Sequence, residues 1–146
     1  TSSLDKTVKL WDLRKSACQK TFAVHKDEVL DIAFNSTGTF LASCSADCTG
    51  RLYNVADASV LPVVFTHDAS ISKIQFNPQG KKILTASEDK KAKLWSLQGE
   101  ELQTLSGHTD DIFSCAFNYQ GDTIITGSKD NTCIIWKDAL AVPDDE

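Results

Sequence analysis

The sequence repeats itself with a period of 41 or 42 residues, which limits its fold more than any other feature. Its only three histidines, His25, His67 and His108, stand 42 and 41 residues apart. Such a period is the mark of a chain built from copies of one supersecondary unit. Four other sets of residues repeat with the same steps: Phe34, Phe76 and Phe117; Ser45, Ser87 and Ser128; Asp47, Asp89 and Asp130; Tyr53, Trp95 and Trp136. Ser3, Asp5 and Trp11 form a partial extra copy at the start of the chain.

Each period reads as four short β-strands. The first (29–34, 71–76 and 112–117) has apolar positions that slip once, as a single bulge would allow. An N-x-x-G turn follows, and its glycine suits a positive φ. The second strand barely alternates, so we expect it to be covered on both faces. The third carries the aromatic residue, and a weaker fourth is expected at 60–65 and 101–105, where Pro62 fits an edge strand.

Composition and charge limit the possible partners. The chain is 41% apolar and 24% charged, without the ~18-residue apolar run of a membrane helix or a signal peptide. A net charge of −5 argues against nucleic acid, which needs a basic face. The five cysteines lack metal-ligand spacing and are expected to be reduced thiols. Because the chain has no Met and begins within the pattern, we expect a piece of a longer protein.

Four antiparallel strands in about 42 residues are typical of a propeller blade, and the chain resembles the WD40-repeat family. It has "GH" at Gly107–His108 and "WD" at Trp11–Asp12, although Tyr53 replaces one tryptophan. The resemblance implies an all-β fold of about three and a half WD40 β-propeller blades from a ring that commonly has seven. The expected parts are the end of a truncated blade (1–22), two repeats (23–65 and 66–105), a last repeat without its outer strand (106–137) and a solvated acidic tail (138–146).

The Ser, His and Asp of each repeat could be read as a hydrolase triad. A catalytic site is built once, however, and this set occurs three times at one spacing. The resemblance implies instead a structural tetrad, in which the aromatic residue bonds the serine, the serine the histidine, and the histidine the aspartate. We therefore expect no enzyme activity, no cofactor and no metal. The predicted tetrads are His25, Ser45, Asp47 and Tyr53; His67, Ser87, Asp89 and Trp95; His108, Ser128, Asp130 and Trp136.

Partner-binding residues of WD40 propellers tend to lie on the narrow top face, around the mouth of the central channel. Phe113 is the strongest candidate, because an aromatic side chain there could anchor a partner; packing against a neighbouring blade is the equal alternative. An exposed Ile134 could also mark a contact, whereas Lys90, Lys91 and Lys93 read as a solvated turn. By family position the candidates are Glu28, Leu30, Ala46, Ser70, Ser72, Glu88, Asp111, Phe113 and Lys129.

Residues 25–38, 71–80 and 108–136 resemble one branch of the family, the dynein assembly factors with WD repeats. This implies a cargo adaptor that bridges outer-arm dynein components and intraflagellar transport complex subunits, in the cytoplasm and in the cilium or flagellum with its basal body region. No nucleic acid, membrane or small-molecule partner is expected. The alternative is another WD40 scaffold, such as a ubiquitin-ligase substrate receptor or a signalling-complex platform.

Overall fold

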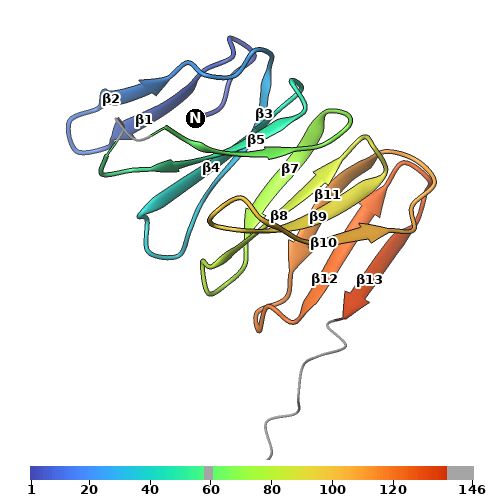
Figure 1. The fold of residues 1–146 in the computed structure, drawn as a ribbon. Helices are drawn as coiled ribbons and strands as arrows, with labels where there is room; N and C mark the ends of the chain where they lie inside the picture. The colour runs from blue at the N-terminus through green and yellow to red at the C-terminus, as the bar shows by residue number, and fades with distance from the viewer. Residues whose placement is uncertain (58–60, 138–146) are drawn as a thin grey trace, which may run out of the picture.

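The computed structural model describes residues 1–57 and 61–137, and these residues form thirteen strands and no helix. All strand pairs are antiparallel, which confirms the all-β prediction (Figure 1). The predictions for the tail 138–146 lie outside the described residues. In chain order the strands are β1 (Val8–Asp12), β2 (Ala17–Phe22), β3 (Val29–Phe34), β4 (Phe40–Ser45), β5 (Thr49–Asn54), β6 (Val63–Thr66), β7 (Ile71–Phe76), β8 (Lys82–Ser87), β9 (Lys91–Ser96), β10 (Glu101–Ser106), β11 (Ile112–Phe117), β12 (Thr123–Ser128) and β13 (Cys133–Lys137).

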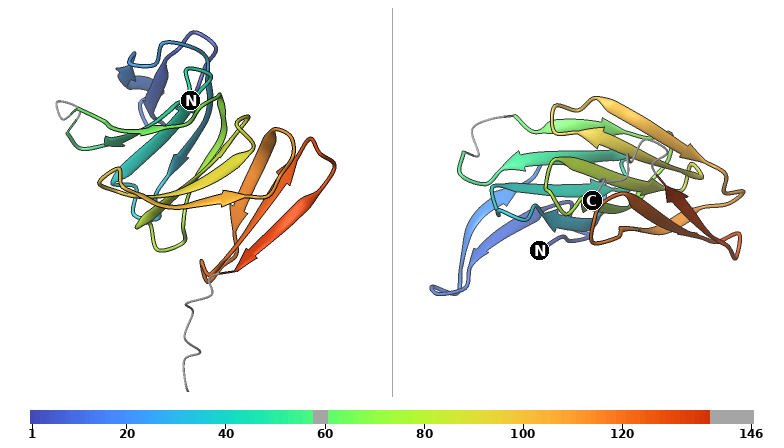
Figure 2. Two further views of the ribbon diagram at one scale, coloured as in Figure 1. Left: turned by 45° about the vertical axis from the view of Figure 1, so that its right-hand side comes forward. Right: turned by 90° about the horizontal axis from the view of Figure 1, so that it is seen from below.

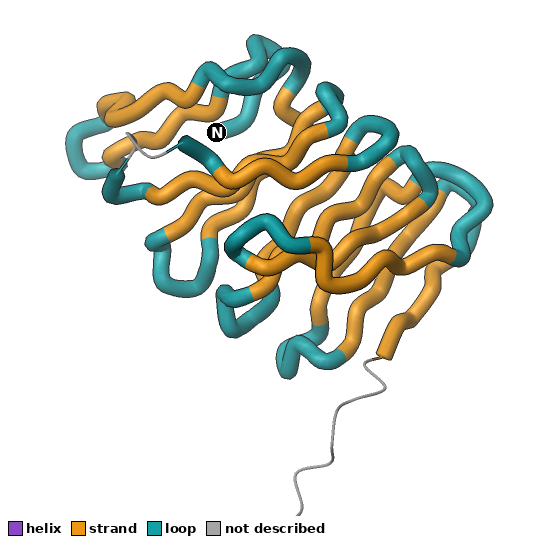
Figure 3. The backbone as a smooth tube through the Cα atoms, in the orientation of Figure 1, coloured by secondary structure: helices purple, strands orange, loops and turns teal. Residues whose placement is uncertain are grey.

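The strands form four sheets, which we call blades A to D. Blade A is β1–β2, blade B is β3–β6, blade C is β7–β10 and blade D is β11–β13. The blades lie side by side in chain order in all views (Figures 1 and 2). The first strands of neighbouring blades are in contact, β3 with β7 and β7 with β11. Loops gather at the two ends of the sheets, which leaves two opposite loop faces (Figure 3).

The local pattern follows the sequence closely. The first strand of blades B, C and D shifts register once, at Val29/Asp31, Ile71/Lys73 and Ile112/Ser114, so the predicted bulge is confirmed. The glycine of each N-x-x-G turn has a positive φ, between 67° and 80°, as predicted. The fourth strand of blade B differs, because it begins at Val63. Pro62 precedes the strand and takes no place in its ladder.

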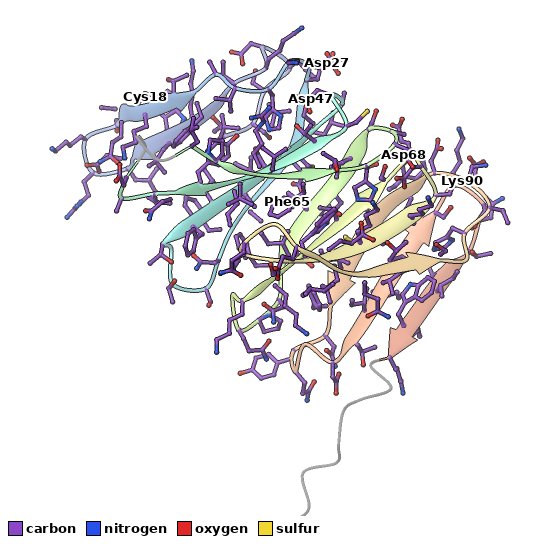
Figure 4. The ribbon with its side chains drawn as sticks, in the orientation of Figure 1. Cys18, Asp27, Asp47, Phe65, Asp68 and Lys90 are labelled. Carbon is purple, nitrogen blue, oxygen red and sulfur yellow. The ribbon has the colours of Figure 1, made fainter. Side chains whose placement is uncertain are left out.

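The hydrophobic core lies between blades and not within them. One cluster joins blades B and C, where Leu52 and Phe65 pack against Ile74 and Trp95. Figure 4 labels Phe65. Similar clusters join A to B and C to D. The second strands β4 and β8 are buried on both faces, as predicted. β12 is only partly buried, and Ile125 is 43% exposed, because no further sheet covers blade D within the described residues.

Candidate functional site

Each of blades B, C and D holds a buried hydrogen-bonded chain, which we call its clasp. In blade D the indole Nε1 of Trp136 donates to the Thr126 hydroxyl at 2.9 Å. That hydroxyl lies 2.8 Å from Nε2 of His108, and Nδ1 of His108 lies 2.8 Å from an Asp130 carboxylate oxygen. A neutral ring that donates from Nδ1 and accepts at Nε2 completes the chain without an unpaired group.

The clasp of blade C has the same geometry. Trp95 Nε1 donates to the Thr85 hydroxyl at 2.9 Å, and this hydroxyl lies 2.8 Å from Nε2 of His67. Nδ1 of His67 lies 2.7 Å from Asp89. Trp95 and the Thr85 hydroxyl are both buried. The chain therefore pairs polar groups that water does not reach, each of which would cost about 1–3 kcal/mol if left unpaired.

Blade B builds its clasp with a tyrosine. The Tyr53 hydroxyl lies 3.0 Å from Ser43 Oγ, which lies 2.7 Å from Nε2 of His25. Nδ1 of His25 lies 3.0 Å from Asp47. Burial raises the pKa of Tyr53 to about 12, so the phenol stays protonated as a donor. The predicted place of Tyr53 in this tetrad agrees with the geometry.

The hydroxyl member of the predicted tetrads is wrong in all three blades. Ser45, Ser87 and Ser128 were expected to bridge the aromatic residue and the histidine, but Ser43, Thr85 and Thr126 do so. Strand register gives the reason, because Trp136 faces Ile124 across the ladder. Thr126 is its diagonal neighbour on the same face, whereas Ser128 lies a further two residues along the strand.

The three expected serines tie the loops at one end of the sheets. Ser128 Oγ donates to the Asp110 carbonyl at 3.0 Å and accepts from the Asp130 N–H at 3.1 Å. Ser45 makes the equivalent pair of bonds with Asp27 and Asp47. They belong to the same polar network, one step further from the core.

The correct hydroxyl column was present in the sequence. Ser43, Thr85 and Thr126 follow the same 42- and 41-residue steps as the histidines. The partial copy in blade A has it too, since Trp11 Nε1 donates to the Thr1 hydroxyl at 3.2 Å. Cross-strand register, combined with the repeat, was the signal that could have selected it.

Electrostatics favour the neutral form of His25 and His67 and the charged form of the three clasp aspartates. Burial lowers the pKa of His25 and His67 and outweighs the hydrogen bond from each to its aspartate. Burial would raise the pKa of Asp47, but bonds from the Thr49 hydroxyl, the Lys26 N–H and His25 lower it to about 2. The Thr132 hydroxyl is the largest cause that lowers the pKa of Asp130.

This geometry contradicts a Ser–His–Asp hydrolase. The hydroxyls that touch the histidines belong to Ser43, Thr85 and Thr126, and all three residues are 0% exposed. Each is also bonded by the aromatic donor. A nucleophile must reach a substrate carbonyl, and a fully buried hydroxyl held between two partners does not. The clasps are structural.

What the clasps hold in place is one loop face, which carries the candidate partner-binding residues. Backbone bonds from Ala46 to Glu28, from Glu88 to Ser70 and from Lys129 to Asp111 set these residues in pairs, one pair on each blade. Asp27, Asp47, Asp68 and Lys90 mark this face along one end of the sheets (Figure 4). Exposed on it are Glu28, Leu30, Glu88, Phe113 and Lys129; half-buried are Ala46, Ser70, Ser72 and Asp111.

The charges of these pairs differ from blade to blade. In blade D, Lys129 Nζ lies 3.5 Å from the Asp111 carboxylate, so its pair is internally neutral. Blades B and C present Glu28 and Glu88 beside uncharged partners. Of these three pairs, those of blades B and C therefore carry a net negative charge and that of blade D does not.

Phe113 holds a position whose surroundings differ between blades. Ser72 is its counterpart in blade C, and Ser72 Oγ donates to the Ile112 carbonyl of the following blade at 2.9 Å. Phe113 is 54% exposed, and Leu30, which holds the same place in blade B, is 39% exposed although blade C follows it. The bond to the next blade is therefore a feature of Ser72 and not of the position in general.

The expectations for Ile134 and the lysine cluster need correction. Ile134 is half-buried, and its Cδ1 lies 3.4 Å from where a Cβ on Gly107 would stand. Lys93 is no solvated turn residue, because its Nζ pairs with Glu101 at 3.0 Å and lies 5.3 Å from the centre of the Trp95 ring. Lys91 lies 3.8 Å from Asp68, and Lys90 is exposed.

The described part of the chain offers neither a metal site nor a membrane-spanning helix. No group of three or more His, Cys, Asp or Glu side chains there is arranged to hold a metal ion. No helix there is long and apolar enough to cross a membrane.

A known family of repeats matches three segments of the chain. The family described as "WD domain, G-beta repeat" matches residues 16–54, 59–96 and 99–137. Among curated proteins, the chain is 30% identical over 109 residues to nuclear distribution protein nudF 1 of Talaromyces marneffei, which covers 72% of this chain and 24% of that protein.

Two further relatives carry different names. The periodic tryptophan protein 2 homolog of Schizosaccharomyces pombe is 31% identical over 102 residues, which cover 69% of this chain and 12% of that protein. Pre-mRNA-processing factor 19 of Caenorhabditis elegans is 32% identical over 89 residues, which cover 61% of this chain and 18% of that protein. The chain thus spans about a quarter or less of the length of these relatives.

Proposed function

The chain belongs to the WD40-repeat family, and on that premise we propose that it is part of a cargo adaptor linking axonemal outer-arm dynein to intraflagellar transport. WD40 proteins are generally non-enzymatic scaffolds that bind other proteins, and the clasps fit that role because they serve only to fix the loops. The finer assignment has one main support, the resemblance of residues 108–136 to the dynein assembly factors with WD repeats. Residues 25–38 and 71–80 extend that resemblance into blades B and C.

Family membership alone does not select the partner. The relatives described above are a nuclear distribution protein, a periodic tryptophan protein and a pre-mRNA-processing factor, and one fold serves many functions. An adaptor of this kind would work in the cytoplasm and in the cilium or flagellum, including its basal body region, and this location is part of the same hypothesis. Its contact residues would be exposed side chains of the loop face, above all Glu28, Glu88 and Lys129.

A pull-down from ciliated-cell extract with the complete protein tests the proposal. We expect outer-arm dynein subunits and intraflagellar transport subunits in the bound fraction. A variant with Glu28→Lys and Glu88→Lys should lose at least one of these groups, while Lys81→Glu, at the opposite loop face, should retain both. Recovery of ubiquitin-ligase or signalling subunits in place of dynein and transport proteins would contradict the adaptor hypothesis and favour the other WD40 scaffolds.

A further inference from the structure

Arg51, in strand β5 of blade B, carries a guanidinium group without a partner among the described residues. Its Nε–H is buried and meets no hydrogen-bond acceptor there. No ion pair of the described residues includes Arg51 either. Buried polar groups of folded proteins are almost always paired, and an unpaired one is unfavourable. An acceptor from outside the chain would therefore stabilise this group.

The counterpart of Arg51 in blade C is fully paired. Strand register makes Lys93 of β9 that counterpart. Lys93 Nζ lies 3.0 Å from a Glu101 carboxylate oxygen and 3.4 Å from the Thr66 carbonyl oxygen. Glu101 pairs with the clasp aromatic residue of blade C, but no residue of β6 pairs with the clasp tyrosine of blade B. Blade B thus keeps the cation and lacks its carboxylate.

Two exposed valines stand beside Arg51, where the junction of blades B and C has polar residues. Val64 is the direct partner of Arg51 across β5 and β6, and it is 42% exposed. Such partners lie on one face of a sheet with Cβ atoms about 4.5–5.5 Å apart. Thr104 is the counterpart of this valine in blade C, opposite Lys93. Blade B therefore presents an apolar side chain where blade C presents a hydroxyl.

The second valine belongs to the end of blade A. Val24 comes directly before a clasp histidine, as Thr66 does one repeat later. Because Lys93 reaches the carbonyl of Thr66, the repeat directs Arg51 toward Val24 in the same way. Burial is the main cause that lowers the pKa of the two clasp histidines that follow, and the charge of Arg51 or of Lys93 lowers each further. Val24 is 37% exposed, so Val24, Arg51 and Val64 form one surface, which we call the flank patch.

We propose that the flank patch binds an extended segment of a partner protein that carries one Asp or Glu carboxylate beside an aliphatic side chain. A carboxylate accepts two parallel bonds from a guanidinium group, so it supplies what Glu101 supplies to Lys93. The aliphatic side chain packs on Val24 and Val64, which removes apolar surface from water. The patch lies along β6, the last strand of its sheet, and is a second surface beside the loop face of the proposed function.

Charge limits the occupant to a single acidic group. Arg51 supplies one positive charge, and the chain as a whole has a net charge of −5. A run of acidic residues would meet that negative excess, whereas one carboxylate is neutralised by one guanidinium group. A phosphorylated side chain carries nearly two negative charges and would leave one of them unpaired.

Fluorescence anisotropy with labelled synthetic peptides tests the proposal on the full chain. The probe is Ser-Gly-Val-Glu-Val-Gly-Ser, and its control has Gln in place of Glu. We expect the Glu peptide to bind about tenfold more tightly, the factor that one charge-assisted pair supplies. Equal binding of the two peptides, or binding of neither, would overturn the proposal. Tighter binding of the phosphoserine peptide than of the Glu peptide would overturn it as well, since the patch would then select phosphate.

Variants that copy residues from another blade separate binding from folding. Arg51→Lys and Val64→Thr introduce the residues that blade C has at the same places, so blade B should still fold. Arg51→Lys should weaken binding of the Glu peptide, because an ammonium group lacks the planar fork. Val64→Thr should weaken it about threefold through lost apolar contact.

A charge control uses a second arginine. Arg51→Gln should remove the preference for the Glu peptide over the Gln peptide. Arg14→Gln takes the same charge from a side chain that is 95% exposed in blade A, and it should leave that preference unchanged. If Arg14→Gln weakens binding as much as Arg51→Gln, or if Val64→Thr binds like the parent, the peptide is not held at the flank patch and the proposal is wrong.

Discussion

Blades C and D are built from the same repeat, yet they differ in how much of the repeat is buried. β8 of blade C has five successive buried residues, with blade B on one face and blade D on the other. β12, its counterpart in blade D, has only two buried residues. Since the two strands occupy the same place in the repeat, the difference comes from the neighbour and not from the strand. A WD40 blade takes most of its core from the blade beside it.

The largest expected effect on stability comes from truncating to alanine the apolar residues at equivalent positions of blades C and D. Leu84 is 0% exposed, and its counterpart Ile125 is 43% exposed. Leu84→Ala should therefore lower the free energy of unfolding by about 2–5 kcal/mol through a cavity. Ile125→Ala should cost less than about 1 kcal/mol, because the removed atoms are half in water. Urea unfolding curves measure both, and similar losses at the two positions would contradict an inter-blade core.

The next effect concerns the clasps. Thr85→Val leaves His67 Nε2 and the buried Trp95 N–H without a partner, and we expect a loss of about 2–3 kcal/mol. Thr126→Val removes the same bonds in blade D, but Trp136 is only half-buried, so water replaces part of them and the loss should be about half as large. Ser128→Ala is the control, because the tetrad predicted from the sequence, with Ser128 as its central hydroxyl, would give this variant the largest loss of stability. A larger loss for Ser128→Ala than for Thr126→Val would restore the serine as the central hydroxyl.

The clasp shows which features the sequence alone predicts and which require the strand pairing. Repetition correctly gave the class of fold, the bulged first strand, the positive-φ glycines and three of the four clasp residues. It did not select Thr126 over Ser128, because both columns repeat with the same step. Only the pairing of β12 with β13 sets which hydroxyl stands beside the indole.

The candidate binding residues were harder to predict for a related reason. Phe113 and Ser72 hold one place in the repeat, but one faces solvent and the other bonds the next blade. Leu30, at the same place in blade B, is 39% exposed although blade C follows it. Exposure of that position therefore depends on the side chain and on its neighbours in the fold, and no pattern within a single repeat contains this information.

Acid should weaken the blade C clasp. Burial lowers the pKa of His67 below its unfolded value near 6.5, despite the opposing bond to Asp89. The unfolded chain therefore binds the proton more readily, so the full contribution to stability is present above pH 6.5 and is lost as the pH falls through and below that value. One proton changes the unfolding free energy by at most about 1.4 kcal/mol per pH unit. Urea unfolding at pH 7.5 and 5.5 should show a smaller drop in His67→Gln than in the parent; an equal drop would mean that His67 does not titrate in this range.

The smallest expected effect is at the edge of blade C, where Lys93 pairs with Glu101 and lies over Trp95. Blade D has Ile134 in the place of Lys93, half-buried beside Gly107, so there the strand position contributes by packing instead of charge. Glu101 is an exposed strand residue, and exposed ion pairs contribute about 0–1 kcal/mol. Glu101→Gln should thus lower stability by less than about 1 kcal/mol at low salt, and the difference from the parent should shrink toward 1 M salt, where the screening length falls to about 3 Å. Ile134→Val, the matched change on blade D, should cost a similar amount that salt does not remove. A salt-independent loss for Glu101→Gln would show that the carboxylate acts through its bond from Thr104, and that the two edges differ less than their residues suggest.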